Sequence, residues 1–306
     1  MVTVALAKCS SYDSEEVYHS VKKSVSLLDV PIKNSKVLIK PNLLYPRKPE
    51  DAVTTHPEVV RAAIQLFKQL NCEVLVGDSP GIHDPIQTAQ ATGILQVCRD
   101  EGIAFVKFMG KKSFTVKNPL IRRKFDLTSY VAEVDHIVNI PKLKTHVMTG
   151  STIAIKNLFG LIVGLHKSQF HFKYYEKEDF AKMLIDLANT INPSLSIVDG
   201  IIGMEGNGPG SGQPKKAGII AASEDPLALD IIMNRFIGIG PMEIWTNKVG
   251  LQTRPADFLK SIKMVGDKIK PVPFKRAEDR PMTFIVPKGA VQFVSKLFAN
   301  KSLHKV

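Results

Sequence analysis

Cysteine is scarce in this chain of 306 residues, which contains only Cys9, Cys72 and Cys98. The three lie far apart and form no Cys-x-x-Cys pair, so one chain cannot build a zinc ribbon or a four-cysteine iron-sulphur cluster from them. We expect reduced thiols that pack in the interior. The sequence therefore predicts no intrinsic iron-sulphur cluster.

Long apolar runs are also missing. No stretch of about 18 uninterrupted apolar residues occurs. The N-terminus lacks the basic start and the long apolar segment of a signal peptide. We therefore expect no transmembrane segment and a cytoplasmic location.

Several catalytic motifs are absent. The chain has no Gly-x-Ser-x-Gly, no His-Glu-x-x-His, and no Gly-Lys-Ser/Thr after its glycine-rich stretch. These absences argue against ordinary serine hydrolases, zincins and P-loop nucleotide enzymes. The few aromatic residues, 7% of the chain, are not interleaved with basic ones, which argues against a stacking platform for single-stranded nucleic acid.

Basic residues are abundant, with a formal net charge of +12. This excess favours an anionic partner, and a small phosphate or carboxylate, nucleic acid and a membrane surface all fit it. Two regions are notably basic. Residues 107–128 are interpreted as an excursion or small inserted lobe, and residues 260–306 as a basic C-terminal segment that ends in an amphipathic helix.

Short β-type runs alternate with helical patterns along the chain. This alternation predicts an α/β fold with a mainly parallel sheet covered by helices. We treat residues 1–306 as a single domain. An architecture of two lobes with a cleft between them is an alternative. The predicted strands cover residues 2–7, 36–40, 72–78, 103–108, 136–141, 195–200 and 217–222, and the clearest helices cover 57–70 and 178–191.

Polar residues stand where the predicted strands end, and open α/β sheets bind ligands beyond the carboxyl ends of their strands. Lys40 and Asn42 follow one strand and Ser79 follows another. Thr55 and His56 open a helix, where they would either cap it or hold an anion. These five residues are candidate ligand contacts.

The strongest local pattern directly follows the apolar run at 136–140. Two lysines and a histidine fall within five residues, and residue types of this kind seldom serve a core. We expect ligand contacts from Lys142, Lys144 and Thr145, and proton transfer by His146.

Lys156 and Asn157 lie in an otherwise apolar segment. Burying a lysine is expensive unless the ammonium meets a carboxylate or a ligand. Lys156 is therefore our first candidate for a catalytic residue, with Asn157 as a ligand contact beside it.

Three carboxylates are candidate ligands of a divalent metal. Asp78 and Asp199 end predicted strands, and Glu205 lies in a loop at 203–213 that contains five glycines. Asn207 in the same loop is a candidate ligand contact. For Asp78, an ordinary turn-forming role is an equal alternative.

Seven blocks occur in a fixed order: KPNLL, TTHPEVVRA, GDSPG, PKLKTH, IKNLFG, DGIIGMEGNGP and DPLALD. Together they resemble the family labelled domain of unknown function 362, over residues 36–230. The resemblance implies an α/β protein. Many family members are joined to a ferredoxin-like module whose cysteines hold iron-sulphur clusters. Here no cysteine follows residue 98, so electron transfer would need a separate redox partner.

The family is also distantly similar to nickel-dependent racemases of hydroxy acids, whose cofactor is held by lysine and histidine. That similarity implies Lys156 and His166 as cofactor contacts.

Our leading hypothesis is an enzyme that binds an anionic small molecule in a lysine-lined cleft, with the reaction and the cofactor unknown. Two alternatives stay open. One is a non-catalytic binding or accessory protein for an iron-sulphur or redox partner, and the other is a racemase-like isomerase with a nickel cofactor. The polar clusters stand at strand ends rather than along one basic stripe, which argues against nucleic acid. A homodimer is the expected assembly.

Overall fold

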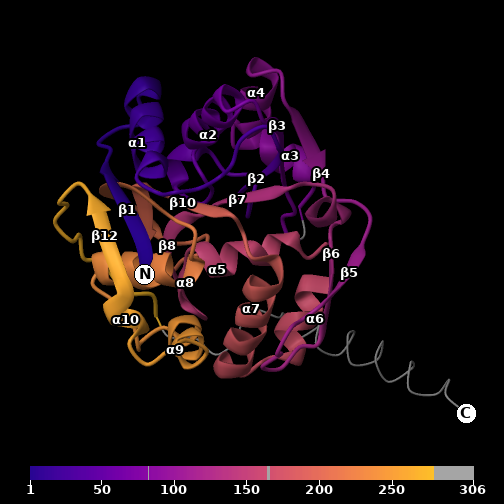
Figure 1. Cartoon of the computed structure of the whole chain (residues 1–306), viewed down its shortest axis with the longest axis vertical. Coiled ribbons are helices and arrows are strands. Elements are labelled where there is room, and N and C mark those ends of the chain that lie inside the picture. Colours follow the sequence, from indigo (N-terminus) through magenta and orange to yellow (C-terminus); the bar gives the residue numbers. More distant parts are fainter. Residues whose placement is uncertain (82, 164–165, 279–306) are drawn as a thin grey trace, which may run out of the picture.

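A ten-stranded sheet organises the molecule (Figure 1). The computed structural model describes residues 1–81, 83–163 and 166–278, with the backbone alone for His166. The strand order is β12-β1-β11-β10-β7-β2-β3-β4, and β8 pairs with β10 and β9. The strands are β1 (Val2–Lys8), β2 (Lys36–Pro41), β3 (Glu73–Asp78), β4 (Ala104–Lys107), β7 (His136–Ile140), β8 (Lys142–His146), β9 (Gly150–Thr152), β10 (Leu195–Glu205), β11 (Gln213–Ser223) and β12 (Ile262–Gly266).

Most neighbouring strands run parallel. The pairs β12 with β1, β10 with β7, β7 with β2, β2 with β3 and β3 with β4 are all parallel. Only β11 runs against its two neighbours on this path, β1 and β10, and the short β9 runs against β8. The predicted α/β class with a mainly parallel sheet is therefore confirmed.

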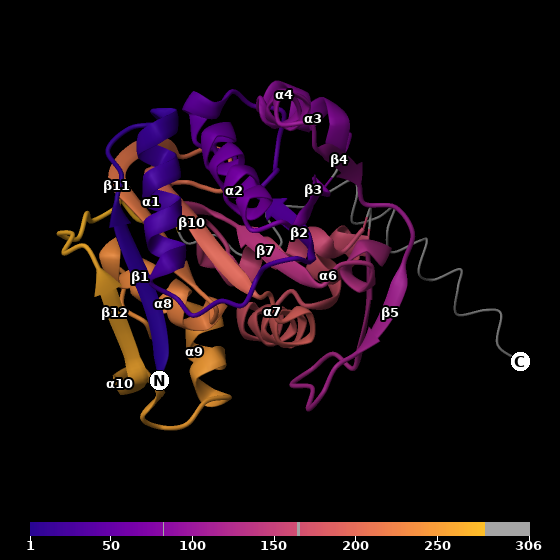
Figure 2. The same ribbon diagram turned by 45° about the horizontal axis from the view of Figure 1, so that its top comes forward.

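Helices cover both faces of the sheet (Figure 2). One face carries α1 (Ser14–Ser26), α2 (Pro57–Gln69), α3 (Pro85–Ala91) and α4 (Ile94–Asp100). The other carries α5 (Ala154–Asn157), α6 (His166–Lys173), α7 (Lys177–Ile191), α8 (Pro226–Phe236) and α9 (Trp245–Gln252). Short helical turns are η1 (Pro49–Asp51), η2 (Ser129–Ala132), η3 (Leu158–Leu161) and α10 (Phe258–Ser261).

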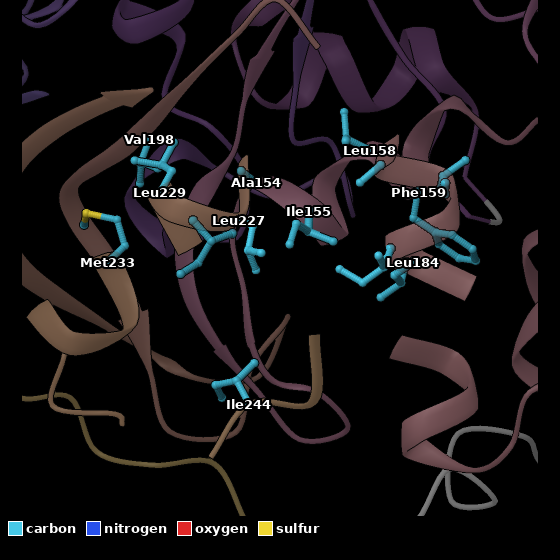
Figure 3. Packing of buried hydrophobic residues seen from close by; sticks show 14 of the residues in the cluster. Ala154, Ile155, Leu158, Phe159, Leu184, Val198, Leu227, Leu229, Met233 and Ile244 are labelled. Carbon is cyan, nitrogen blue, oxygen red and sulfur yellow. The ribbon is translucent and has the colours of Figure 1, made fainter. Parts of the chain in front are cut away.

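Two apolar cores follow from this layering, because successive side chains of a strand point to opposite faces. In β2, Val37 and Ile39 belong to the core beneath α1 and α2, whereas Leu38 belongs to the core beneath α5, α7 and α8. Figure 3 shows the second core, where Ile155 of α5 lies among side chains of neighbouring helices. By the same alternation, the side chain of Lys40 points to the same face as that of Leu38, the face covered by α5.

The structure differs from the sequence prediction at one strand end, and it adds a strand that the sequence did not single out. Asp199 does not end a strand, because β10 continues to Glu205 past a register shift between Gly200 and Ile202. The polar cluster after β7 forms the added strand: Pro141 interrupts the strand structure for one residue, and the residues that follow form β8. The glycine-rich loop is correspondingly shorter than predicted.

The basic excursion contains a separate two-stranded sheet of β5 (Lys112–Thr115) and β6 (Lys124–Leu127). Its inward residues Phe125 and Leu127 are buried in the core of the α5 face. The connection between the strands is held by the buried carboxylate of Asp186 on α7. It accepts the backbone N–H groups of residues 120, 121 and 122 at 2.8, 2.9 and 2.7 Å.

The predicted amphipathic final helix falls within residues 279–306, outside the described residues. In the described ranges, no helix combines the length and the apolar character that crossing a bilayer requires.

Candidate functional site

The switch point of the sheet lies between β2 and β7. From β2 the chain adds β3 and β4 on one side, and it then returns to place β7 on the other side of β2. The carboxyl ends of β2 and β7 thus adjoin, with Lys40 opposite Asn139 in register. Ligands of open parallel sheets bind at such a point, and most of the candidate residues lie near it.

A chain of amides links the two strand ends. The Asn42 side chain donates to Asn157 Oδ1 at 3.0 Å, and Asn157 donates in turn to Asn139 Oδ1 at 2.8 Å. Asn139 also donates to the carbonyl of Ala154 at 3.0 Å. Asn157 therefore fixes α5 to the strand ends.

Two lysines of the cluster are paired with carboxylates in the interior. Lys40 Nζ lies 2.9 Å from Asp78 Oδ1, and Lys142 Nζ lies 2.8 Å from Asp199 Oδ2, with all four side chains at most 2% exposed. Burial lowers the pKa of both lysines, against the opposing attraction of their carboxylates. These two ammonium charges are compensated without any ligand.

Tyr12, which the sequence did not single out, completes the second pair. Its hydroxyl accepts from Lys142 Nζ at 2.7 Å and donates to Asp199 Oδ1 at 2.9 Å. Its ring stacks on His56 at a centroid distance of 3.5 Å, and the backbone N–H of His56 donates to Asp199 at 2.9 Å. Burial raises the pKa of Tyr12 and lowers that of His56 to about 4, so both groups are neutral at pH 7.

Lys144 differs because, among the described residues, its buried ammonium has only neutral acceptors. Nζ donates to Asn42 Oδ1 and to the carbonyl of Val53, each at 2.7 Å, and the side chain is 1% exposed. Burial holds the pKa of Lys144 well below its usual range, and the neighbouring charges of Lys156 and Lys142 lower it further. This lysine is placed to gain from a bound anion.

Two further lysines lack a carboxylate partner among the described residues. Lys156 of α5 is half-buried over the rings of Phe159 and Phe180, 5.7 and 5.8 Å from their centroids. Desolvation lowers its pKa to about 8. Lys167 of α6, which the sequence did not reveal, is buried and donates to the carbonyl of Ser79. Desolvation is also the main cause that lowers the pKa of Lys167 to about 7.

Two imidazoles lie beside these lysines. His146 Nδ1 accepts the backbone N–H of Met148 at 3.0 Å, which places the proton of the neutral ring on Nε2. Burial, then the nearby Lys156 and Lys144, hold the pKa of His146 well below its usual value. His171 of α6 has a pKa lowered to about 3, mainly by desolvation, and its buried Nδ1 has no partner within the described part of the chain.

His146 also lines a cavity of about 320 Å³. The β8–β9 turn forms one wall of this cavity, and Lys177, Trp245 and Arg276 contribute to the rest. The cavity adjoins the lysine cluster through His146, because that imidazole is close enough to Lys156 and Lys144 for their charges to lower its pKa.

A buried carboxylate positions the helix that carries Lys156. Asp230 of α8 accepts the backbone N–H groups of Ala154 and Ile155, at 2.7 and 3.3 Å, at the start of α5. Burial raises the pKa of Asp230 to about 8. Gly160 in η3 then lets the chain pass over the Lys40–Asp78 pair, since a Cβ there would overlap Asp78 Oδ1 and lie 2.6 Å from Lys40 Nζ.

Several predicted ligand contacts have structural partners instead. Thr55 Oγ1 donates to the carbonyl of Ile140 at 2.6 Å, and Thr145 Oγ1 donates to the carbonyl of Gly206 at 2.7 Å. His56, rather than a threonine, caps α2 through Nδ1 at 3.2 Å from the N–H of Glu58. Asn207 accepts from the backbone of Glu278 at 2.9 Å. Of the remaining candidates, Asn42 accepts from Lys144 Nζ through Oδ1, and Ser79 accepts from Lys167 Nζ through its backbone carbonyl.

The three predicted metal ligands are not brought together. Asp78 and Asp199 belong to separate ion pairs, and Glu205 accepts the backbone N–H of Lys275 at 2.8 Å. In residues 1–81, 83–163 and 166–278, no group of three His, Cys, Asp or Glu side chains has a geometry that could hold a metal ion. These donors therefore do not fit a divalent metal, and the side chain of His166 lies outside the described residues.

Comparison with known proteins shows to which family the chain belongs. A solved structure, the lactate racemase apoprotein from Thermoanaerobacterium thermosaccharolyticum, superposes with a TM-score of 0.49 at 13% identity, over 78% of this chain and 57% of the racemase chain. A thylakoid-associated protein from Synechocystis sp. is 32% identical over 265 residues, which cover 84% of this chain and 82% of that protein. Residues 37–235 match the family described as domain of unknown function (DUF362), and the chain belongs to that family.

Proposed function

We propose that this chain is an enzyme that binds an anionic small molecule at the switch point between β2 and β7. The supporting observation is an excess of desolvated positive charge. Five lysines lie close enough there to affect one another, and two of them are each paired with an aspartate. Within the described part of the chain, Lys144, Lys156 and Lys167 are left without a paired carboxylate. Such uncompensated ammonium groups favour a ligand that brings negative charge.

The same geometry supports a division of roles. Lys144 would neutralise the ligand from a fixed position, because its two hydrogen bonds to Asn42 and Val53 orient it. His146 would donate a hydrogen bond from Nε2 and not act as a base, since its Nδ1 already accepts a backbone N–H. Proton transfer passes to Lys156 in this proposal, because an amine with a pKa of about 8 exchanges protons readily near pH 7. The reaction itself stays open.

Sulfate is a suitable probe because its charge does not change between pH 5 and 10. We expect wild-type protein to bind sulfate in isothermal titration calorimetry, and Lys156→Met to bind it at least tenfold more weakly, as loss of a close charge-assisted contact costs about 1.5–3 kcal/mol. The matched control is Lys33→Met, which removes an exposed lysine elsewhere. Thermal melting of both variants reports whether the fold survives.

Full sulfate affinity in both Lys156→Met and Lys144→Met, with unchanged melting, would remove these lysines from the site. Loss of affinity in the control as well would show that bulk charge alone retains the anion.

The proposed location is the cytoplasm. The proposal is supported by Cys9, Cys72 and Cys98, which are all free thiols and buried, as expected in a reducing compartment.

A further inference from the structure

The β5–β6 hairpin carries a concentration of positive charge that the proposed anion site does not use. Residues 107–128 contain seven lysines and arginines and one aspartate, a formal charge of +6 within a chain of +12. Half of the net charge thus lies in 22 residues. Figure 2 shows the hairpin on the outer side of the molecule, beside α7 and away from α1 and β1.

The end of this hairpin, residues 117–124, is here called the basic tip. Lys117, Arg123 and Lys124 are exposed, and none of them forms an ion pair with another described residue. Leu120, between them, is 41% exposed, although the hairpin has an inward face on which Phe125 is fully buried. An apolar side chain is therefore presented to solvent in the same turn as three exposed cations.

The basic tip is held in one conformation. Asp186 accepts three consecutive backbone N–H groups, from Leu120 to Arg122. The N–H of Val116 donates to the carbonyl of Arg123 at 3.0 Å and closes the turn. A surface fixed before contact loses little conformational entropy on binding.

Cations around an exposed apolar side chain match the chemistry of an anionic lipid surface. Lysine and arginine are attracted to lipid phosphates, and a leucine gains by entering the boundary between headgroups and acyl chains. Nucleic acid fits less well, because residues 116–124 contain no aromatic side chain on which a base could stack. We propose that the basic tip docks this protein on anionic bilayers, with Leu120 inserted and Lys117, Arg123 and Lys124 on the headgroups.

Co-sedimentation of the full chain with vesicles tests this proposal. We expect binding to vesicles of phosphatidylcholine mixed with phosphatidylglycerol, none to phosphatidylcholine alone, and weaker binding as salt rises. Replacing Lys117, Arg123 and Lys124 together by Glu should lower the partition coefficient on the order of 100-fold or more, since each basic residue contributes about fivefold. Leu120→Ser alone should lower it several-fold without changing the salt dependence.

The matched control replaces three exposed lysines elsewhere, Lys33, Lys48 and Lys268, by Glu, which gives the same net charge. Equal losses in both triple variants would overturn the proposal in favour of bulk charge. A tip variant that keeps its vesicle binding but loses binding to single-stranded RNA would overturn it in favour of nucleic acid. Sulfate titration of each variant checks that the fold is intact, and its outcome does not depend on lipid binding.

Discussion

Lys40 and Asp78 form a buried ion pair at 2.9 Å, and Gly160 of η3 packs against it. The pair joins the ends of β2 and β3, and Asp78 also accepts the backbone N–H of Leu43 at 2.8 Å. The carboxylate thus fixes both the lysine and the turn that leads into the candidate site.

Asp78→Asn should strongly destabilise the protein. The substitution keeps the shape and an acceptor for Leu43, but it leaves the Lys40 ammonium buried without a counter-ion, which costs about 3–5 kcal/mol. Urea unfolding followed by circular dichroism measures the change. The double variant Lys40→Met with Asp78→Asn should recover part of the loss, and no recovery would contradict this account.

A control for that measurement is Glu178→Gln, which breaks the exposed pair between Glu178 and Lys182 at 2.9 Å. Its urea midpoint should stay close to that of the wild type, because exposed pairs are screened by water and salt.

Gly160→Ala should also destabilise the protein, although it adds a single methyl group. The new Cβ meets Asp78 Oδ1 and Lys40 Nζ, and overpacking of this kind costs about 1–3 kcal/mol. Gly81→Ala is the comparison, because no atom lies within 4 Å of a Cβ at that position. Equal melting temperatures for the two alanine variants would show that η3 moves away without cost.

The stability of the protein should depend on pH through Asp230. Its pKa is raised from 3.8 in the unfolded chain to about 8 in the fold, so the folded state holds a proton that the unfolded state releases. The stability linked to this proton is complete below about pH 4 and is lost as the pH rises toward 8. Urea curves at pH 5 and pH 8 should therefore show a larger decrease for the wild type than for Asp230→Asn. Parallel curves would mean that Asp230 is ionised in the fold.

Sulfate affinity should fall with rising pH. Lys167 and Lys156 have pKa values lowered to about 7 and about 8, so the ammonium forms that attract the anion disappear between pH 6 and pH 9. We expect a decrease of about tenfold or more over this range. Lys167→Met should remove the part of the decrease that is centred near pH 7. An affinity that does not change with pH would place sulfate away from both amines.

Asp186→Leu should loosen the β5–β6 hairpin without unfolding the sheet. Three backbone N–H groups lose their common acceptor, while the inward side chains of the hairpin stay in place. Hydrogen exchange by mass spectrometry should show faster exchange in peptides spanning residues 116–124 and unchanged exchange in β2 and β7. Uniform acceleration across the protein would assign Asp186 a role in global stability instead.

The sequence predicted the sheet well, because alternation of apolar and polar residues depends on neighbours along the chain. Every predicted strand is present, as are the helices at Pro57–Gln69 and Lys177–Ile191. Strand β8 was missed because Pro141 reads as an end, although the spacing of Lys142, Lys144 and His146 is the period of two that marks a strand. The small strand pair β8–β9 was therefore not predicted.

The candidate site was only partly predictable. The cationic residues near β2 and β7 stood out because they interrupt apolar runs, but Lys167 lies in a polar helix where one more lysine is not unusual. The contacts of Tyr12 and Asp230 could not be predicted, since their partners are 187 and 76 residues away. Nothing local in the sequence reveals which distant group each of these two side chains contacts.

The placement of β1 has a consequence for the order in which the chain folds. Its two neighbours in the sheet are β11 and β12, whose residues pair with it from positions 219–222 and 262–266. More than two hundred residues separate β1 from the partner at either of its edges. Until these partners pair with it, β1 exposes unpaired backbone on both sides, the condition that invites aggregation and recruits chaperones. The sheet therefore cannot be completed around β1 until these distant segments are present.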